Sequence, residues 1–97
     1  MAHLAGVGGG GWSNAVLEDI IFFKVHTPHF RNMDNAVLAE SLSNRYPECR
    51  NMTGGDVESA YKDVKKSHTY QVVFKKVSEI SPKKVVERKV RMGLQPA

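Results

Sequence analysis

The most apolar stretch of the chain is EDIIFFKV, residues 18–25, in which Ile20 to Phe23 are four consecutive large side chains, all β-branched or aromatic. A short continuous run of this kind is typical of a strand that is covered on both faces. We therefore predict a strand over residues 18–25, placed centrally in a sheet that helices flank. Pro28 follows it closely and ends the strand, because proline lacks a backbone donor and restricts the residue before it.

A second strand is predicted over residues 70–77, YQVVFKKV. Successive side chains of a strand point to opposite faces, which gives this segment two apolar faces. One face would carry Tyr70, Val72 and Phe74, and the other Val73 and Val77. The adjacent Lys75 and Lys76 would bring the far end of this strand to solvent or to an anionic partner.

The segment between the two strands has helical spacing over residues 32–46. Asn32 is a suitable cap and Asp34 favours the positive first turn. Pro47 ends the segment. Its apolar face is made by Leu38, Ala39, Leu42 and Tyr46.

Residues 56–66, which follow the turn signal Gly54-Gly55, predict another helix of about three turns. Its apolar stripe recurs at positions i, i+3, i+4 and i+7: Val57, Ala60, Tyr61 and Val64.

The last predicted helix has the clearest boundaries in the chain. Ser81 is a typical N-cap, Pro82 occupies the first helical position, and Gly93 follows the last turn. The buried stripe of this helix is predicted to consist of Val85, Val86 and Val90.

Together these elements predict an α/β fold, a single small domain over residues 12–97 with a sheet flanked by helices. Residues 1–11, MAHLAGVGGGG, contain five glycines and are predicted to be a flexible tail. A chain of 97 residues buries too little surface to build a deep active-site cleft easily. Since no apolar run approaches about 18 residues, we expect no membrane insertion.

Charge is distributed unevenly along the chain. The sequence has 14 Lys and Arg against 10 Asp and Glu, a net charge of +4. Residues 1–49 hold 3 basic and 5 acidic side chains, whereas residues 50–97 hold 11 and 5. The second half is therefore the basic half, and 10 of the cations lie between residues 62 and 91.

Cations spread over the polar faces of neighbouring elements can neutralise phosphates and give salt-dependent, sequence-independent affinity. The alternative is a solvated charged face that only prevents aggregation. No aromatic and glycine-rich RNA-binding signature is present, so base-specific recognition is not expected. The residues that we predict to contact nucleic acid are Lys75, Lys76, Lys83, Lys84, Arg88, Lys89 and Arg91.

Three residues are candidates for metal binding or catalysis. His26 and His29 form an HxxH pair, but a zinc site needs three or four ligands and no second pair has suitable spacing. Cys49 has no CxxC companion for dithiol exchange and no base linked to it in sequence. We therefore expect no metal, no cofactor and no enzyme activity, with a metal- or thiol-dependent enzyme as a third hypothesis.

Several segments resemble a known family. The stretch LEDIIFFKV, a helix ending in RYPEC, the stretch HTYQVVF and the closing helix ISPKKVVERKV are similar to a small thioredoxin-like family. Several mitochondrial ribosomal proteins and an accessory subunit of respiratory complex I share that family. The resemblance covers roughly residues 16–92 and implies a thioredoxin-like fold used as a structural wedge. Where the family has a second strand, this chain has RNMTGGDVESAYKDVKK, which predicts a loop and a helix.

The resemblance and the basic second half together imply a non-catalytic structural component of the large mitochondrial ribosomal subunit, located in the matrix. Its partners would be rRNA phosphate and neighbouring ribosomal proteins, with no small-molecule substrate. The alternative is an accessory subunit of complex I that is held by protein–protein contacts. In that assembly, apolar and aromatic anchors would dominate. The candidate anchors are Trp12, Phe22, Phe30 and Tyr61.

Overall fold

The structure, a computed structural model, describes residues 11–28 and 32–94. Over these ranges the chain forms five α-helices and one short 3₁₀ helix, and no strand. The elements are α1 (Asn14–Val25), α2 (Asn32–Arg45), η2 (Pro47–Cys49), α3 (Gly54–Val64), α4 (Thr69–Ser78) and α5 (Pro82–Arg91). The prediction of an α/β, thioredoxin-like fold is therefore wrong, because both predicted strands are helices.

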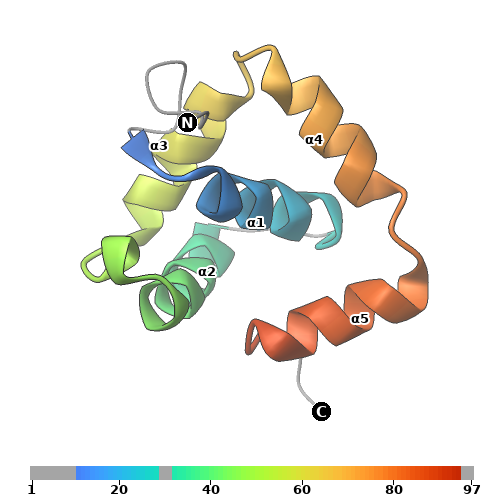
Figure 1. The fold of residues 1–97 in the computed structure, drawn as a ribbon. Helices are drawn as coiled ribbons and strands as arrows, with labels where there is room; N and C mark the ends of the chain where they lie inside the picture. The colour runs from blue at the N-terminus through green and yellow to red at the C-terminus, as the bar shows by residue number, and fades with distance from the viewer. Residues whose placement is uncertain (1–10, 29–31, 95–97) are drawn as a thin grey trace.

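Helix α1 lies at the centre of the molecule, with α2 and α3 on one side and α4 and α5 on the other (Figure 1). Its four consecutive apolar residues are all buried, with exposed fractions of 0% for Ile20, Ile21 and Phe22 and 6% for Phe23. A helix that is covered on every side is apolar all round and has no amphipathic pattern. The same run therefore fits a buried helix as well as a buried strand.

Local signals favour the helix at residues 14–25. Ser13 has extended backbone angles and its hydroxyl accepts a hydrogen bond from the backbone N–H of Val16, which satisfies one free donor of the first turn. Lys24 lies in the last turn, where a cation offsets the partial negative charge of the helix end.

Helix α4 replaces the second predicted strand. Its inward side is given by Tyr70, Val73 and Val77, which are spaced i, i+3 and i+7 as one face of a helix requires. Val72 and Phe74, which the strand prediction placed together with Tyr70, are 68% and 40% exposed. The β-branched residues of this segment favour strands only weakly, and packing against α1 determines the outcome.

Alanine substitutions in α4 distinguish the two structures. Replacing Val77, which is fully buried, is expected to lower the free energy of unfolding by about 2 kcal/mol through lost burial and a cavity. Replacing the exposed Val72 is expected to raise it by about 0.5 kcal/mol, because alanine has the higher helix propensity. Chemical denaturation followed by circular dichroism measures both values. A larger loss at Val72 than at Val77 would contradict the helix.

The predicted helices over residues 32–46 and 56–66 are confirmed as α2 and α3. Leu38, Ala39 and Leu42 are buried on α2, which ends at Arg45 just before Pro47. Asn32 is the first residue of α2, and its proposed capping side chain lies outside what the structure describes. On α3, Val57, Ala60 and Val64 are buried, as the spacing predicted.

Helix α3 begins earlier than predicted. Its first residues are Gly54 and Gly55. Thr53 before them and Asp56 after them form a capping box around the first turn. A Cβ atom at Gly54 would lie 3.1 Å from the backbone N of Ala36 on α2, so glycine lets the two helices approach closely.

Helix α5 has the predicted boundaries but presents a different face to the core. Ser81 caps it, Pro82 opens it, and Gly93 follows with φ of +73°. However, Val86 and Val90 are 51% and 52% exposed, so the predicted buried stripe is wrong. The inward side of α5 carries the half-buried Val85, Arg88 and Lys89, and the buried Met92 follows the helix end.

Helices α4 and α5 together form what we call the arm: α4 lies beside α1, and after a short connection α5 runs back below α1 toward α2 (Figure 1). The radius of gyration is 12.5 Å, as expected for about 100 folded residues, so the arm stays against the other helices. The predicted flexible tail falls almost entirely on residues 1–10, which lie outside the described part of the chain. In the described residues, no helix is long and apolar enough to span a membrane.

Candidate functional site

The seven cations predicted to contact nucleic acid fall into two groups. Lys75, Lys83, Lys84 and Arg91 are exposed on α4 and α5. Of these, Lys75 pairs with Glu79 at 3.1 Å, and the other three have no polar partner among the described residues. Lys76, Arg88 and Lys89 instead hold the arm to α1. The sequence predicted one group of seven contact residues. The structure divides them into exposed cations, which can bind a ligand, and cations that contact α1.

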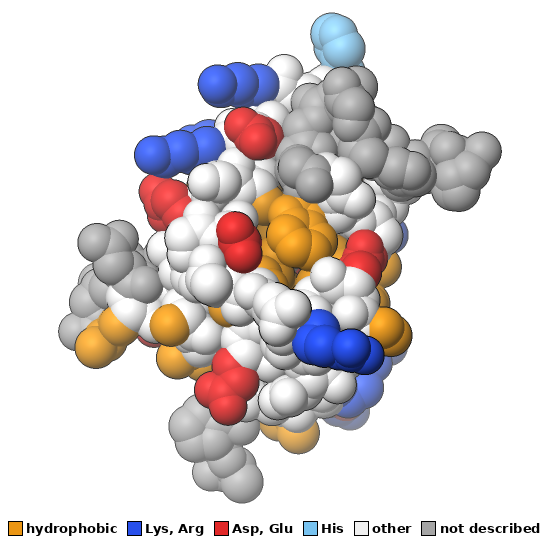
Figure 2. Space-filling model, turned by 90° about the vertical axis from the view of Figure 1, so that its left-hand side faces the viewer, with side chains coloured by type: hydrophobic (Ala, Val, Ile, Leu, Met, Phe, Trp, Pro, Cys, Tyr) orange, Lys and Arg blue, Asp and Glu red, His pale blue; other side chains and the backbone are white. Residues whose placement is uncertain are grey.

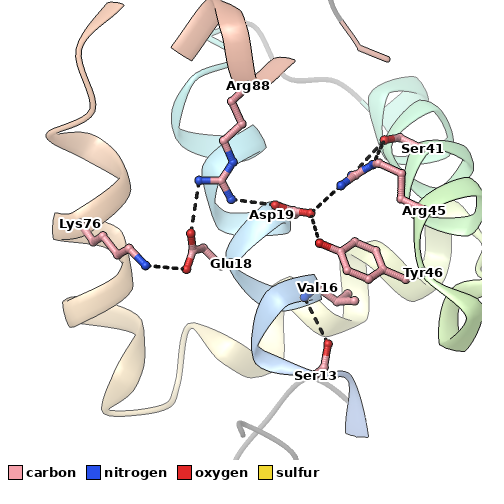
Figure 3. A network of polar contacts seen from close by, with 9 residues as sticks. All are labelled: Ser13, Val16, Glu18, Asp19, Ser41, Arg45, Tyr46, Lys76 and Arg88. Carbon is pink, nitrogen blue, oxygen red and sulfur yellow. Dashed lines mark hydrogen bonds and ion pairs between the residues drawn. The ribbon is translucent and has the colours of Figure 1, made fainter. Parts of the chain in front are cut away.

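The centre of the structural group is Asp19 on α1, whose side chain is only 6% exposed. Its Oδ2 accepts hydrogen bonds from Arg45 Nη1 at 2.9 Å and from the Tyr46 hydroxyl at 2.8 Å, and its Oδ1 accepts one from Arg88 Nη2 at 2.7 Å. Figure 3 shows these donors converging on the carboxylate: Arg45 from α2, Tyr46 from just after the end of α2, and Arg88 from α5. A buried charge with several charged donors is compensated, which explains how α1 can carry a carboxylate so close to the core.

Glu18 extends this network toward α4. Arg88 Nη1 lies 3.2 Å from Glu18 Oε2, and Lys76 Nζ lies 3.0 Å from Glu18 Oε1 (Figure 3). The guanidinium of Arg88 thus bridges two neighbouring carboxylates of α1, each through a different nitrogen of its planar fork. The Lys76 side chain remains 65% exposed, so its pair adds little stability.

Arg88 and Lys89 also contact the aromatic core. The Arg88 guanidinium lies 4.4 Å from the ring centroid of Phe22, and Lys89 Nζ lies 5.9 Å from that of Phe23. Lys89 Nζ donates a hydrogen bond to the backbone oxygen of His26, and burial lowers the pKa of this ammonium. Two of the predicted phosphate-binding residues therefore have their charged ends directed inward.

The C-terminal end of α5 is fixed to α2. The Ser41 hydroxyl donates a 2.6 Å hydrogen bond to the backbone oxygen of Met92, and Arg45 donates from Nε and Nη2 to the same hydroxyl oxygen at 3.2 and 3.0 Å. Burial and the bond to Asp19 raise the pKa of Tyr46. This chain of contacts runs unbroken from Asp19 through Arg45 to the helix end.

A cleft of about 340 Å³ opens above the network, between α1, α2 and α5. Its lining consists of Asp19, Arg45, Tyr46, Arg88, Arg91 and Met92. A second cavity of about 370 Å³ adjoins it along α2 and shares Arg45, Arg91 and Met92 with it. Three arginines therefore line one concave surface. We call the 340 Å³ cavity the arginine cleft.

Sequence analysis did not identify Asp19, Arg45 or Tyr46 as site residues. The available signal was the Glu18-Asp19 pair immediately before the apolar run, since acidic residues beside buried positions need cationic partners. Among the residues predicted at the site, Arg88 and Arg91 line the arginine cleft, and the five lysines do not.

Of the candidate metal and thiol residues, the structure describes His26 and Cys49. His26 Nε2 donates a 2.7 Å hydrogen bond to the backbone oxygen of Val77, and its ring packs 5.0 Å from that of Phe22. Cys49 is fully buried, and burial raises the pKa of its thiol to about 11. His29 lies outside the described residues. Within the described ranges, no three His, Cys, Asp or Glu residues group as metal ligands.

The candidate apolar anchors are placed differently from the prediction. Phe22 is fully buried, so it is a core residue and the prediction of a surface anchor is wrong. Trp12 and Tyr61 are half-buried and pack against the core, and Phe30 lies outside the described residues. The large apolar side chains that do reach the surface are Met33, Val37, Val72, Phe74, Val86 and Val90.

The face formed by the left-hand side of Figure 1 has a mixed charge pattern. Figure 2 shows basic and acidic side chains interspersed on it, without a region of one sign. On α3, for example, Lys62 pairs with Glu58 at 3.7 Å. The arm differs from this face, because Lys83, Lys84 and Arg91 on α5 have no polar partner among the described residues.

Comparison of the chain with family models, with curated proteins and with solved structures finds no significant match. The fold and the site are therefore interpreted from the residues of this chain.

Proposed function

We propose that this protein is a non-catalytic, RNA-contacting component of a ribonucleoprotein assembly. The observation that carries the proposal is the set of exposed cations on the arm, of which Lys83, Lys84 and Arg91 have no acidic partner among the described residues. Exposed cations of this kind bind phosphates without reading the base sequence. The buried Cys49 and the hydrogen-bonded His26 support a binding role over a catalytic one.

The particular assembly that we propose is the large mitochondrial ribosomal subunit in the matrix, as the sequence resemblance implied. The predicted strands of that resemblance are helices, so the basic arm supports contact with RNA, and the choice of this particle stays a prediction. Fractionation of mitochondria tests it directly. We expect the protein to sediment with ribosomal particles and to leave them as salt is raised.

The contact residues of the proposal are now narrower than the sequence suggested. They are Lys75, Lys83, Lys84 and Arg91, because Lys76, Arg88 and Lys89 contact α1 or its C-terminal end. A variant that removes Arg88 or Lys89 would loosen the arm as well as reduce its charge. Such a variant would confuse a folding defect with a binding defect.

Replacing Lys75, Lys83 and Lys84 together by glutamine tests the contact. We expect about a 100-fold loss of affinity for single-stranded RNA at 0.1 M salt, since each phosphate contact contributes about fivefold under these conditions. Fluorescence anisotropy with a labelled oligonucleotide measures the affinity. The fold should be retained, because the three ammonium groups are exposed.

The matched control replaces Lys62, Lys65 and Lys66 by glutamine, which removes the same charge from the region of α3. These lysines are also exposed, but Lys62 pairs with Glu58 and Lys65 lies over the Tyr61 ring. We expect a loss of less than about tenfold, arising from net charge alone. Equal losses in the two triple variants would show that the arm is not the contact surface.

A second candidate function has one supporting observation. Val72 on α4 and Val86 and Val90 on α5 are more than half exposed, which suits a protein–protein contact such as that of an accessory subunit of respiratory complex I. Binding through these residues would depend little on salt. Co-sedimentation with complex I that persists at high salt would favour this second function over the first.

A further inference from the structure

The arginine cleft presents hydrogen-bond donors that the protein itself does not use. Three arginines line it, and the guanidinium of each has five N–H groups. The described contacts of Arg45 use three of its groups, those of Arg88 use two, and those of Arg91 use none. Ten of the fifteen donors are therefore left for solvent or for a ligand.

Two of the three guanidiniums are held in place before any ligand arrives. Asp19 binds both Arg45 and Arg88, at 2.9 and 2.7 Å, and each guanidinium has a further contact, Arg45 with Ser41 and Arg88 with Glu18. The side chains of Arg45 and Arg88 are 26% and 18% exposed, so part of each still reaches the cleft. A ligand would pay little side-chain ordering for these two arginines, because their conformations are already fixed.

The local charge indicates the kind of ligand. Three arginines and Lys76, which pairs with Glu18, outnumber the carboxylates of Asp19 and Glu18 by two charges, so the cleft favours an anion. Glu40 on the adjoining cavity wall and Glu87, one turn before Arg91, lower this excess and disfavour a ligand with more than one negative charge.

The surroundings of the cleft favour a phosphodiester over a protein carboxylate. Lys84, Arg88 and Arg91 are spaced i, i+4 and i+7 and so share one side of α5. Lys84 is exposed about 10 Å along the helix from Arg91. A chain of repeating anions can occupy the cleft and meet this second cation at the same time.

We infer that the arginine cleft binds one phosphodiester group of an RNA strand, held by Arg91 together with the free edges of Arg45 and Arg88. This inference rests on the proposed function and adds a defined phosphate position to it. The exposed lysines would supply general attraction, and the cleft would fix one point of the strand.

The test uses dimethyl phosphate as the smallest phosphodiester, added to the intact protein. We expect it to shift the backbone amide signal of Met92 in ¹H–¹⁵N spectra, because Met92 lines the cleft. Acetate and chloride at the same ionic strength should give much smaller shifts. The shift should disappear in Arg91→Gln, whose fold should be unchanged because Arg91 has no described polar contact.

RNA affinity supplies the second measurement, with Lys83→Gln as the control that removes the same charge from α5 outside the cleft. We expect Arg91→Gln to lower the RNA affinity about 20-fold, because charge-assisted hydrogen bonds are stronger in a partly enclosed site. We expect Lys83→Gln to lower it about fivefold, as for one exposed phosphate contact.

The outcomes separate this inference from the proposed function. Normal RNA binding with equal losses in the two variants and no Met92 shift would overturn the cleft and leave the proposed function standing. Acetate shifts as large as those of dimethyl phosphate would overturn the phosphodiester in favour of a protein carboxylate. A Met92 shift without RNA binding at any salt concentration would overturn the proposed function, and with it RNA as the source of the phosphate.

Discussion

Replacing Phe22 by alanine is expected to lower the free energy of unfolding by about 4 kcal/mol, the largest effect of any substitution considered. Phe22 is fully buried on the central helix α1, and its ring contacts both the His26 ring, at 5.0 Å, and the Arg88 guanidinium, at 4.4 Å. Alanine would leave a cavity and remove the surface on which α5 rests. Domains of this size have about 5–15 kcal/mol of stability in total, so much of the margin would be lost.

Urea denaturation followed by circular dichroism at the helix band measures this loss. Phe74→Ala is the matched control, because it removes the same side chain from α4, where it is 40% exposed. We expect about 1 kcal/mol there, from the contact with Tyr70 at 5.7 Å between ring centroids. Similar losses at the two positions would be incompatible with α1 as the buried central helix.

Replacing Asp19 by alanine is expected to cost about 3 kcal/mol, the second largest effect. The change removes the acceptor shared by Arg45, Tyr46 and Arg88, and leaves two guanidiniums facing each other without their counter-charge. This loss of stability is at the lower end of the range for removing one partner of a buried ion pair, because both arginine side chains keep partial access to water.

The control for Asp19 is Glu87→Ala, which removes an equal charge from the exposed side of α5 and should change stability by less than about 0.5 kcal/mol. Asp19→Asn adds a second comparison. It keeps the shape and one acceptor oxygen, so it should lose less than Asp19→Ala. An alanine variant as stable as the Glu87 control would mean that the network does not hold the arm.

Helix boundaries were the part of the fold that could be predicted, since they depend on local chemistry. Ser81, Pro82 and Gly93 delimit α5, and Pro47 follows the end of α2, as the sequence indicated. The helical spacing of Val57, Ala60 and Val64 located α3 for the same reason. Caps and apolar spacing act within one element and need no knowledge of its neighbours.

The identity of α1 and α4 could not be predicted from the same signals. Ile20 to Phe23 are buried on all sides, and a run without periodicity is compatible with a buried strand or a buried helix. The N-cap at Ser13 was the local feature that separated the two. With this segment interpreted as a strand, the alternation of Tyr70, Val72 and Phe74 supports a second strand and a sheet that the described residues do not form.

The role of the seven cations as nucleic-acid contacts stays a prediction, and the sequence pattern did not show which of them are structural. Lys83, Lys84 and Arg91 are exposed on the arm as expected, whereas Arg88 and Lys89 turn toward α1. The long apolar stems of Arg and Lys can pack between two helices while the charged end reaches a partner. A pattern based on apolar residues does not reveal such buried positions. Because Val86 and Val90 are apolar, the pattern assigned the core side of α5 to them.

The salt dependence of RNA binding tests the proposed function most directly. The affinity of the intact protein for a single-stranded oligonucleotide would be measured over a series of potassium chloride concentrations. Four phosphate contacts, through Lys75, Lys83, Lys84 and Arg91, predict a slope of about −3 for the logarithm of the association constant against the logarithm of salt concentration. A slope near zero, or no binding at low salt, would contradict the proposal that the arm of α4 and α5 contacts RNA.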